Sequence, residues 1–87
     1  MQHDDIAGTV QEYIRKNFVF DEKRVVGEEE SLLGSGIIDS TGILELIAFL
    51  EQTYHVAFKD NELVADNFDS IKRITVFVTS KLNHTRN

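Results

Sequence analysis

Hydrophobic residues recur at helical spacing in three separate stretches of this 87-residue chain. Steps of three and four between apolar positions place the side chains on one face of a helix. The first stretch predicts a helix over residues 4–17. Asp4 and Asp5 stand at its start and Arg15 and Lys16 at its end, where each charge suits the helix dipole. Its predicted buried face consists of Ile6, Val10, Tyr13, Ile14 and Phe18.

The second stretch predicts a helix over residues 40–54, and the third a helix over residues 71–82. The third contains the β-branched segment ITVFVT, but the sequence offers no second strand to pair with it, so a helix is favoured. The buried stripe of the second helix is Ile43, Leu46, Ile47, Leu50 and Tyr54, and that of the third is Ile71, Ile74, Phe77, Val78 and Leu82.

Three residues on the flank of the second helix extend its apolar surface: Thr41, Leu44 and Ala48. This surface exceeds what packing against one layer requires, so we expect part of it to meet a partner. The alternative is that all of it belongs to the core.

The segments between these helices predict one long loop and one short helix. Residues 19–38 lack helical periodicity, and their apolar residues favour an ordered loop packed on the core; these are Val25, Leu32, Leu33, Ile37 and Ile38. Asp60 can cap a short helical turn that runs through Val64, and Asp69 or Ser70 can cap the last helix. The final residues, NHTRN, are expected to fray.

Together these elements predict an all-α fold. We expect a small up-down bundle of three longer helices and one short helix, with the long loop between the first two helices. At 87 residues the chain has room for a single domain, with an ordered core over about residues 4–82.

Charge is distributed unevenly along the chain, whose net charge is −6. Six acidic residues and no Lys or Arg lie between Val25 and Phe58: Glu28, Glu29, Glu30, Asp39, Glu45 and Glu51. Such a field repels nucleic acid and favours basic protein partners, although an ordinary solvated acidic surface would look the same. No apolar run is long enough to cross a membrane and the N-terminus does not resemble a signal peptide, so we expect a cytoplasmic protein without membrane insertion.

Few residues offer catalytic chemistry of their own. The chain has no cysteine, and His3, His55 and His84 are too far apart in sequence for a typical metal motif. It has no GxxxxGK phosphate loop and no GxSxG nucleophile elbow. We therefore expect neither an enzyme nor a metal protein.

Ser40 is the exception, because it stands where a glycine-containing loop meets the second helix, in GSGIIDSTGILELIAFLE. Asp39 and Ser40 both suit a helix N-cap. A phosphate attached to the Ser40 hydroxyl would also lie at the positive end of the helix. Gly34, Gly36 and Gly42 leave little side-chain bulk around it, so an enzyme could approach closely.

The motif around Ser40 resembles the acyl, aminoacyl and peptidyl carrier protein family. The resemblance consists of Asp39-Ser40, the following helix with the pattern LELxxFLEQTY, the preceding loop SLLGSGIID, and Phe68 before the last helix. It covers roughly residues 4–82.

The resemblance implies that Ser40 carries a 4′-phosphopantetheine arm, which a phosphopantetheinyl transferase moves from coenzyme A. The arm's thiol would hold an acyl or aminoacyl cargo as a thioester, loaded by an activating ligase and passed to an acyltransferase or synthase. Asp39 matches the aspartate associated with transferase recognition, and Phe68 the apolar residue beside the arm. Thr41, Leu44 and Ala48 match the exposed partner-facing positions, and Glu45 and Glu51 the acidic ones. We expect a monomer.

Within that family GIIDSTG is most similar to discrete carriers of the D-alanyl or aminoacyl type. The common DSL motif is replaced by Asp39-Ser40-Thr41, and the docking helix has only two glutamates. Two alternatives stay open: a housekeeping fatty-acid-type carrier, and an unmodified four-helix interaction module in which Ser40 only caps.

Overall fold

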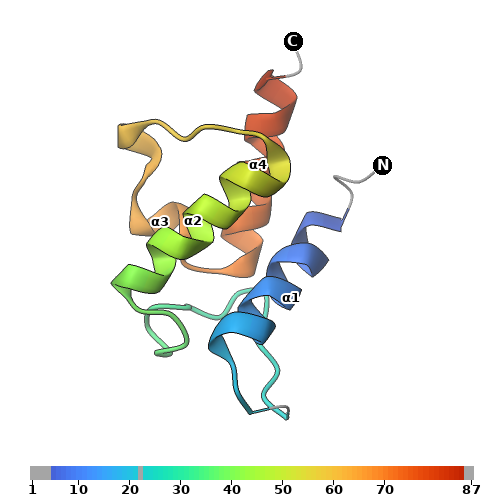
Figure 1. The fold of residues 1–87 in the computed structure, drawn as a ribbon, viewed down its shortest axis with the longest axis vertical. Coiled ribbons are helices and arrows are strands. Elements are labelled where there is room, and N and C mark those ends of the chain that lie inside the picture. Colours follow the sequence, from blue (N-terminus) through green and yellow to red (C-terminus); the bar gives the residue numbers. More distant parts are fainter. Residues whose placement is uncertain (1–4, 22, 86–87) are drawn as a thin grey trace.

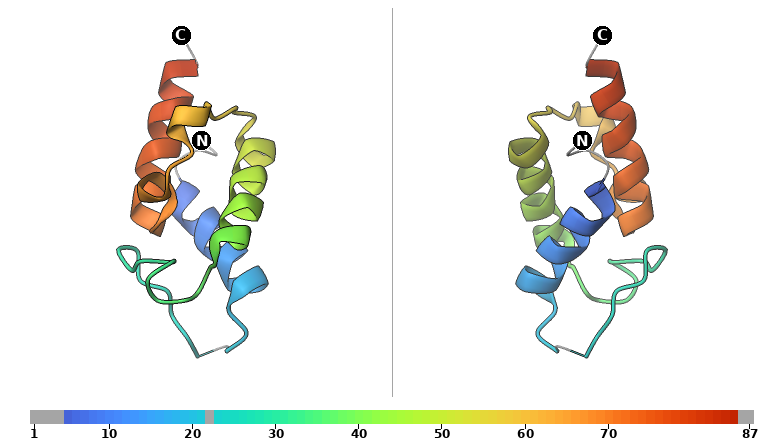
Figure 2. Two further views of the ribbon diagram at one scale, coloured as in Figure 1. Left: turned by 90° about the vertical axis from the view of Figure 1, so that its left-hand side faces the viewer. Right: turned by 90° about the vertical axis from the view of Figure 1, so that its right-hand side faces the viewer.

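The computed structural model describes residues 5–21 and 23–85, and in these residues it contains helices and no strand. The elements are α1 (Ile6–Phe18), α2 (Ser40–Tyr54), the 3-10 helix η2 (Asp60–Glu62), α3 (Ala65–Phe68) and α4 (Ile71–Thr85). The predicted all-α bundle with a long loop after its first helix is confirmed. α1 runs in the opposite direction to α2 and α4, and the loop closes the lower end of the molecule (Figure 1, Figure 2).

Helix boundaries differ from the prediction at three places. α1 begins at Ile6 after Asp5, and Asp4, the predicted start, lies outside the described residues. The turn predicted from Asp60 to Val64 is the shorter η2, which ends at Glu62, and a further short helix that was not predicted, α3, follows and ends at Phe68. α4 continues to Thr85, and the fraying expected from residue 83 onward is therefore wrong as far as residue 85.

The core contains the apolar stripes that the periodicity predicted. Ile6, Val10 and Ile14 of α1 are buried against α4 and α2, while Tyr13 and Phe18 are half-buried. The remaining buried residues of the helices are Leu46, Ile47, Leu50 and Tyr54 of α2, Phe68 of α3, and Ile71, Ile74, Val78 and Leu82 of α4. Ile43 and Phe77 are only partly buried.

The loop between α1 and α2 is ordered and packed on the core, as predicted. Leu32 and Ile38 are buried and Leu33 and Ile37 partly so, which confirms four of the five anchors. The fifth anchor was assigned to the wrong residue: Val25 is 75% exposed, and its neighbour Val26 is buried instead. A one-residue difference of this kind cannot be read from sequence in a segment without periodicity.

α2 begins and ends for different local reasons. At its start the Asp39 side chain accepts a hydrogen bond from the Gly42 N–H. At its end His55 adopts a left-handed conformation with φ of 56°, and its N–H donates to the Glu51 carbonyl. This left-handed closure is a common way to satisfy the last carbonyls of a helix.

Gly42 fixes how closely the first turn of α2 approaches α1. A Cβ atom at this position would lie 2.8 Å from Ile38 Cγ2 and 2.9 Å from Phe18 Cε1. The sequence suggested that Gly42 leaves room for an incoming enzyme, but the residue is buried and the space it saves is inside the protein. Glycine at this position therefore serves packing.

We predict that Gly42→Ala lowers the free energy of unfolding by about 1–2 kcal/mol. Alanine in a helix is ordinarily up to about 1 kcal/mol better than glycine, but overpacking of a filled site costs about 1–3 kcal/mol. Urea denaturation would measure the change. Gly27→Ala is the matched control, because its Cβ would approach nothing closer than 3.8 Å. A stabilised Gly42→Ala variant would show that Phe18 and Ile38 can move aside.

Candidate functional site around Ser40

The first turn of α2 divides two roles between Asp39 and Ser40. Asp39 Oδ1 lies 2.7 Å from the Gly42 nitrogen and caps the helix. Ser40 is the first residue of the helix proper, and its side chain is exposed. Its hydroxyl has no hydrogen-bond partner among the described residues, so the capping role that the sequence left open to either residue falls to Asp39.

Ser40 lies at the edge of a small apolar pocket with a volume of about 150 Å³. α2 forms one side of this pocket, Leu33 of the loop forms a second, and the segment from Leu63 to Phe68 forms the third. All of the lining side chains apart from Ser40 are apolar: Leu33, Ile43, Leu44, Ile47, Leu63, Val64, Ala65 and Phe68. A hydroxyl without an internal partner therefore borders a hydrophobic pocket.

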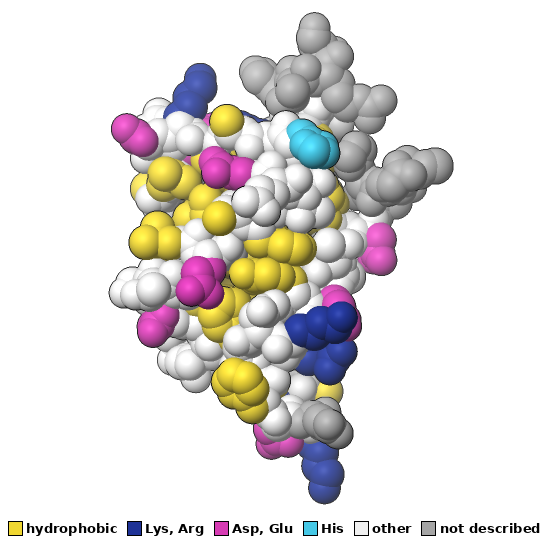
Figure 3. Space-filling view, viewed as in Figure 1, with side chains coloured by type: hydrophobic (Ala, Val, Ile, Leu, Met, Phe, Trp, Pro, Cys, Tyr) yellow, Lys and Arg dark blue, Asp and Glu magenta, His cyan; other side chains and the backbone are white. Residues whose placement is uncertain are grey.

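The rim of the pocket exposes hydrophobic surface to solvent. Leu44 is 65% exposed, Val64 47% and Leu63 41%. Over the face that α2 presents in Figure 3, hydrophobic side chains gather at the centre and acidic ones lie around them. Exposed apolar side chains that border one pocket are typical of a surface that meets a ligand or partner.

The partner-facing residues predicted on α2 occupy different environments. Thr41, Leu44, Glu45 and Ala48 are exposed on the outside of the helix, and with Asp39 and Ser40 they form one surface. Glu51 differs, because it is partly buried and its Oε2 lies 3.1 Å from the Phe58 nitrogen, from which it accepts a hydrogen bond. Its carboxylate supports the chain after α2.

The acidic stretch is also less available to partners than its sequence suggests. Glu30 forms an ion pair with Arg24, which, together with the Gly27 N–H, lowers the pKa of the Glu30 carboxyl. Glu29 Oε2 lies 3.4 Å from Lys72 Nζ. With Glu51 engaged as well, Glu45 is the acid on α2 that remains directed to solvent.

Phe68 lines the same pocket as Ser40, but it lies within the core. It is fully buried, and its ring makes edge contacts with Phe58 and Phe77 at centroid distances of 5.4 and 5.7 Å. The ring therefore forms the floor of the pocket.

Sequence reasoning missed most of the other lining residues. Leu44 was predicted as partner-facing, whereas Ile43 and Ile47 were assigned to the core. They follow Ser40 at steps of three and seven, so helical spacing could have placed them beside it. Leu33, Leu63, Val64 and Ala65 come from segments without periodicity. Their approach to Ser40 depends on the tertiary fold, and no local pattern indicates it.

In the described residues no carboxylate or imidazole is hydrogen-bonded to the Ser40 hydroxyl. Asp39 is engaged in capping, and His55 stands at the opposite end of α2, about 22 Å away at 1.5 Å per residue. A serine nucleophile needs a base within about 3 Å. The described residues around Ser40 therefore supply a hydroxyl and no base that is hydrogen-bonded to it.

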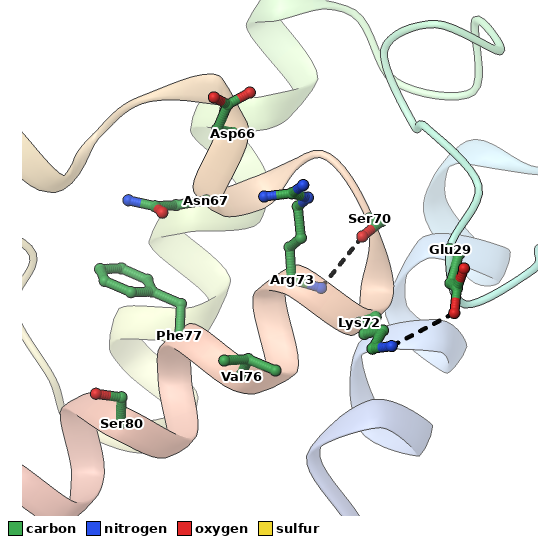
Figure 4. Close-up of a pocket in the computed structure, with 9 residues that line it drawn as sticks. All are labelled: Glu29, Asp66, Asn67, Ser70, Lys72, Arg73, Val76, Phe77 and Ser80. Atoms are coloured by element: carbon green, nitrogen blue, oxygen red, sulfur yellow. Dashed lines mark hydrogen bonds and ion pairs between the residues drawn. The ribbon is translucent and has the colours of Figure 1, made fainter.

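A larger groove lies elsewhere, along the outer side of α4 (Figure 4). Its volume is about 550 Å³, and its charged lining residues are two acids, Glu29 and Asp66, and two bases, Lys72 and Arg73. It shares no lining residue with the pocket at Ser40.

Neither a metal cluster nor a membrane-spanning helix is found in the part of the chain that the structure describes. His3 lies outside that part. No protein-family model matches the chain, and no curated protein matches it.

A partly buried ion pair holds the segment that forms the third wall of the pocket. Glu62 Oε1 lies 2.5 Å from Lys81 Nζ of α4 and 2.7 Å from the Lys59 nitrogen. The Glu62 carbonyl accepts a hydrogen bond from the Asn67 side chain at 2.8 Å. Leu63 and Val64 follow directly, so this network sets their position.

We predict that removing the cap destabilises the protein whereas removing the serine hydroxyl does not. Asp39→Ala should lower the free energy of unfolding by about 1 kcal/mol. Asp39→Asn should lower it much less, because asparagine is also a good cap. Ser40→Ala should change it by less than about 0.5 kcal/mol. Urea denaturation measures all three, and equal losses for Asp39→Ala and Ser40→Ala would contradict the division of roles.

We also predict that the Glu62–Lys81 pair makes stability depend on pH. The bonds from Lys81 and the Lys59 N–H lower the pKa of Glu62, so its contribution is present at neutral pH and is lost as pH falls through that lowered value. The difference in Tm between wild type and Glu62→Gln should be largest near pH 7 and should diminish as pH falls below about 4, the ordinary range of a glutamate. Glu45→Gln is the control, and a constant difference for Glu62→Gln would contradict the assignment.

Proposed function

We propose that this protein is a carrier whose Ser40 hydroxyl is the attachment point for a 4′-phosphopantetheine arm. The observation that supports this proposal is the exposed Ser40 hydroxyl, without an internal partner, at the edge of an apolar pocket. The resemblance of roughly residues 4–82 to the carrier family supplies the identity of the arm. When bound, the arm would supply the thiol that holds the cargo as a thioester.

The residues around Ser40 fit the chemistry of such an arm. A phosphodiester on Ser40 Oγ would lie at the N-terminus of a helix of 15 residues, where backbone N–H groups and the helix dipole favour negative charge. The Asp39 carboxylate adds negative charge nearby, but its Oδ1 is directed to the Gly42 N–H.

Attachment needs only a hydroxyl from this chain. Ser40 Oγ would attack the phosphorus of coenzyme A that bears the pantetheine, and the bond from that phosphorus to the 3′,5′-ADP portion would break. The serine proton would pass to a base of the transferase. A base supplied by the transferase agrees with the finding that no base is hydrogen-bonded to Ser40 in the described residues.

The pocket suits a small apolar group. Apolar cavities of about 150 Å³ in proteins hold molecules of the size of benzene. The pocket could therefore shelter the end of the arm or a compact cargo, and a long acyl chain would need the walls to separate. This favours an aminoacyl or short acyl cargo over a fatty-acid role.

The surface around Ser40 is the proposed docking site for partner enzymes. Leu44 offers an apolar contact of high exposure, and Asp39 and Glu45 offer negative charge beside it. The partners would be a transferase, a cargo-activating ligase and a downstream acyltransferase or synthase. Each should present a basic surface with an apolar centre.

Co-expression with a broad-specificity phosphopantetheinyl transferase, followed by intact mass measurement, tests the proposal. We expect wild type to gain the mass of one phosphopantetheinyl group and Ser40→Ala to gain none. Ser80→Ala, which removes an exposed serine on α4, should be modified like wild type. An unmodified wild type, or a modified Ser40→Ala, overturns the proposal, and in cells full complementation by Ser40→Ala would favour the unmodified interaction module.

A further inference from the structure

Asp69, between α3 and α4, makes three hydrogen bonds to the loop that precedes α2. Its Oδ2 accepts from the Ser31 hydroxyl at 2.7 Å, and its Oδ1 accepts from the Leu33 N–H at 2.9 Å. Its carbonyl accepts from the Leu32 N–H at 2.6 Å. Of the two residues predicted as possible caps of α4, Asp69 and Ser70, it is Ser70 that caps the helix, with its Oγ 3.1 Å from the Arg73 nitrogen (Figure 4). The Asp69 carboxylate is therefore committed to the loop.

The bonds of Asp69 reach two of the three walls of the pocket at Ser40. Asp69 directly follows Phe68, the floor of the pocket and the last residue of α3. Its Oδ1 accepts a hydrogen bond from the Leu33 N–H, and Leu33 lines the loop side of the same pocket. One carboxylate thus fixes the spacing between the loop wall and the α3 wall.

The same bonds continue toward Ser40 through the backbone. Leu32 donates its N–H to Asp69 and accepts, through its carbonyl, the Ile38 N–H at 3.1 Å. Ile38 is buried and directly precedes Asp39 and Ser40. Gly34 N also donates to Ser31 Oγ at 2.8 Å, so the segment from Ser31 to Ile38 is closed on itself and held at one point by Asp69.

The loop has other attachments to α4 that do not involve Asp69. The Lys72 N–H donates to the Glu28 carbonyl at 2.9 Å, and Lys72 Nζ pairs with Glu29 (Figure 4). Leu32 and Ile38 are buried in the core in addition. The fold can therefore survive loss of the Asp69 carboxylate while the geometry at the pocket changes.

We propose that Asp69 is a positioning residue that holds Leu33 against α3 and thereby sets how deeply a group attached to Ser40 enters the pocket. The part of this inference that concerns an attached group rests on the proposed function. The part that concerns Leu33 and Ile38 does not, and it can be measured on the unmodified protein.

Hydrogen exchange on the unmodified protein tests the coupling itself. In Asp69→Ala the Leu33 and Ile38 amides should exchange about tenfold faster, the change expected when local opening becomes easier by one hydrogen bond. The amide of Ile14 in α1 should be unaffected. Asp66→Ala, which removes an exposed carboxylate of α3, is the matched control and should change neither amide. An unchanged Ile38 amide in Asp69→Ala overturns the inference, whether or not Ser40 is ever modified.

A solvent-sensitive probe on Ser40 tests the consequence for the pocket. A transferase would attach the arm from a coenzyme A analogue whose thiol carries a dansyl group, and the emission maximum would report the polarity around it. We expect blue-shifted emission in wild type and Asp66→Ala, and a red shift in Asp69→Ala. Ser31→Ala, which removes one of the two carboxylate bonds and also the bond from the Gly34 N–H, should lie between them. Equal emission from wild type and Asp69→Ala overturns the inference.

Asp69→Asn separates geometry from charge. Its amide oxygen can accept from Leu33, and its NH₂ group can donate to the rotatable Ser31 hydroxyl, so emission and exchange should stay close to wild type. A red shift as large as that of Asp69→Ala would overturn a role through hydrogen-bond geometry. If Asp69→Ala does not fold, Ser31→Ala decides in both experiments. Failure of every variant, wild type included, to take up the probe would overturn the proposed function, and the exchange data would then decide the inference.

Discussion

The structure depends on holding a long loop against the corner between α3 and α4. Because the loop leads directly into Asp39 and Ser40, a loop with several conformations would also leave the start of α2 without one fixed position. Burial of Leu32 and Ile38 provides the driving force, and hydrogen bonds of Leu32 to Asp69 and Ile38 provide the register. Apolar burial alone is non-directional and would tolerate several arrangements of such a loop. The polar contacts at its ends select one of them.

Much of the fold could be predicted from sequence because the helices bury faces with regular spacing. All residues of the apolar stripes predicted for α1 and α4 are buried or half-buried. In the irregular segments fewer features could be predicted. Val25 was chosen as a core residue where Val26 is buried, and one short turn was expected where η2 and α3 form. In such segments the partners that decide burial are distant in sequence, and no periodicity reports on them.

The candidate site shows the same contrast. Ser40 and the α2 surface around it follow from one motif and one helix, and the structure places Thr41, Leu44, Glu45 and Ala48 together on the outside. The pocket requires Leu33 and the residues of α3, which come from either side of α2 in sequence. The role of Gly42 was misjudged for a related reason, since only the fold brings Phe18 to it.

Capping by the residue before Ser40 has a thermodynamic consequence. When the side chain that stabilises a helix end is also the one that is modified, each chemical change alters the folding equilibrium. Here the stabilising bond belongs to Asp39 and the exposed hydroxyl to Ser40. Under the proposed function, loss of the group from Ser40 would therefore leave the bond that caps the helix in place, and the unmodified protein would keep the stability that Asp39 provides.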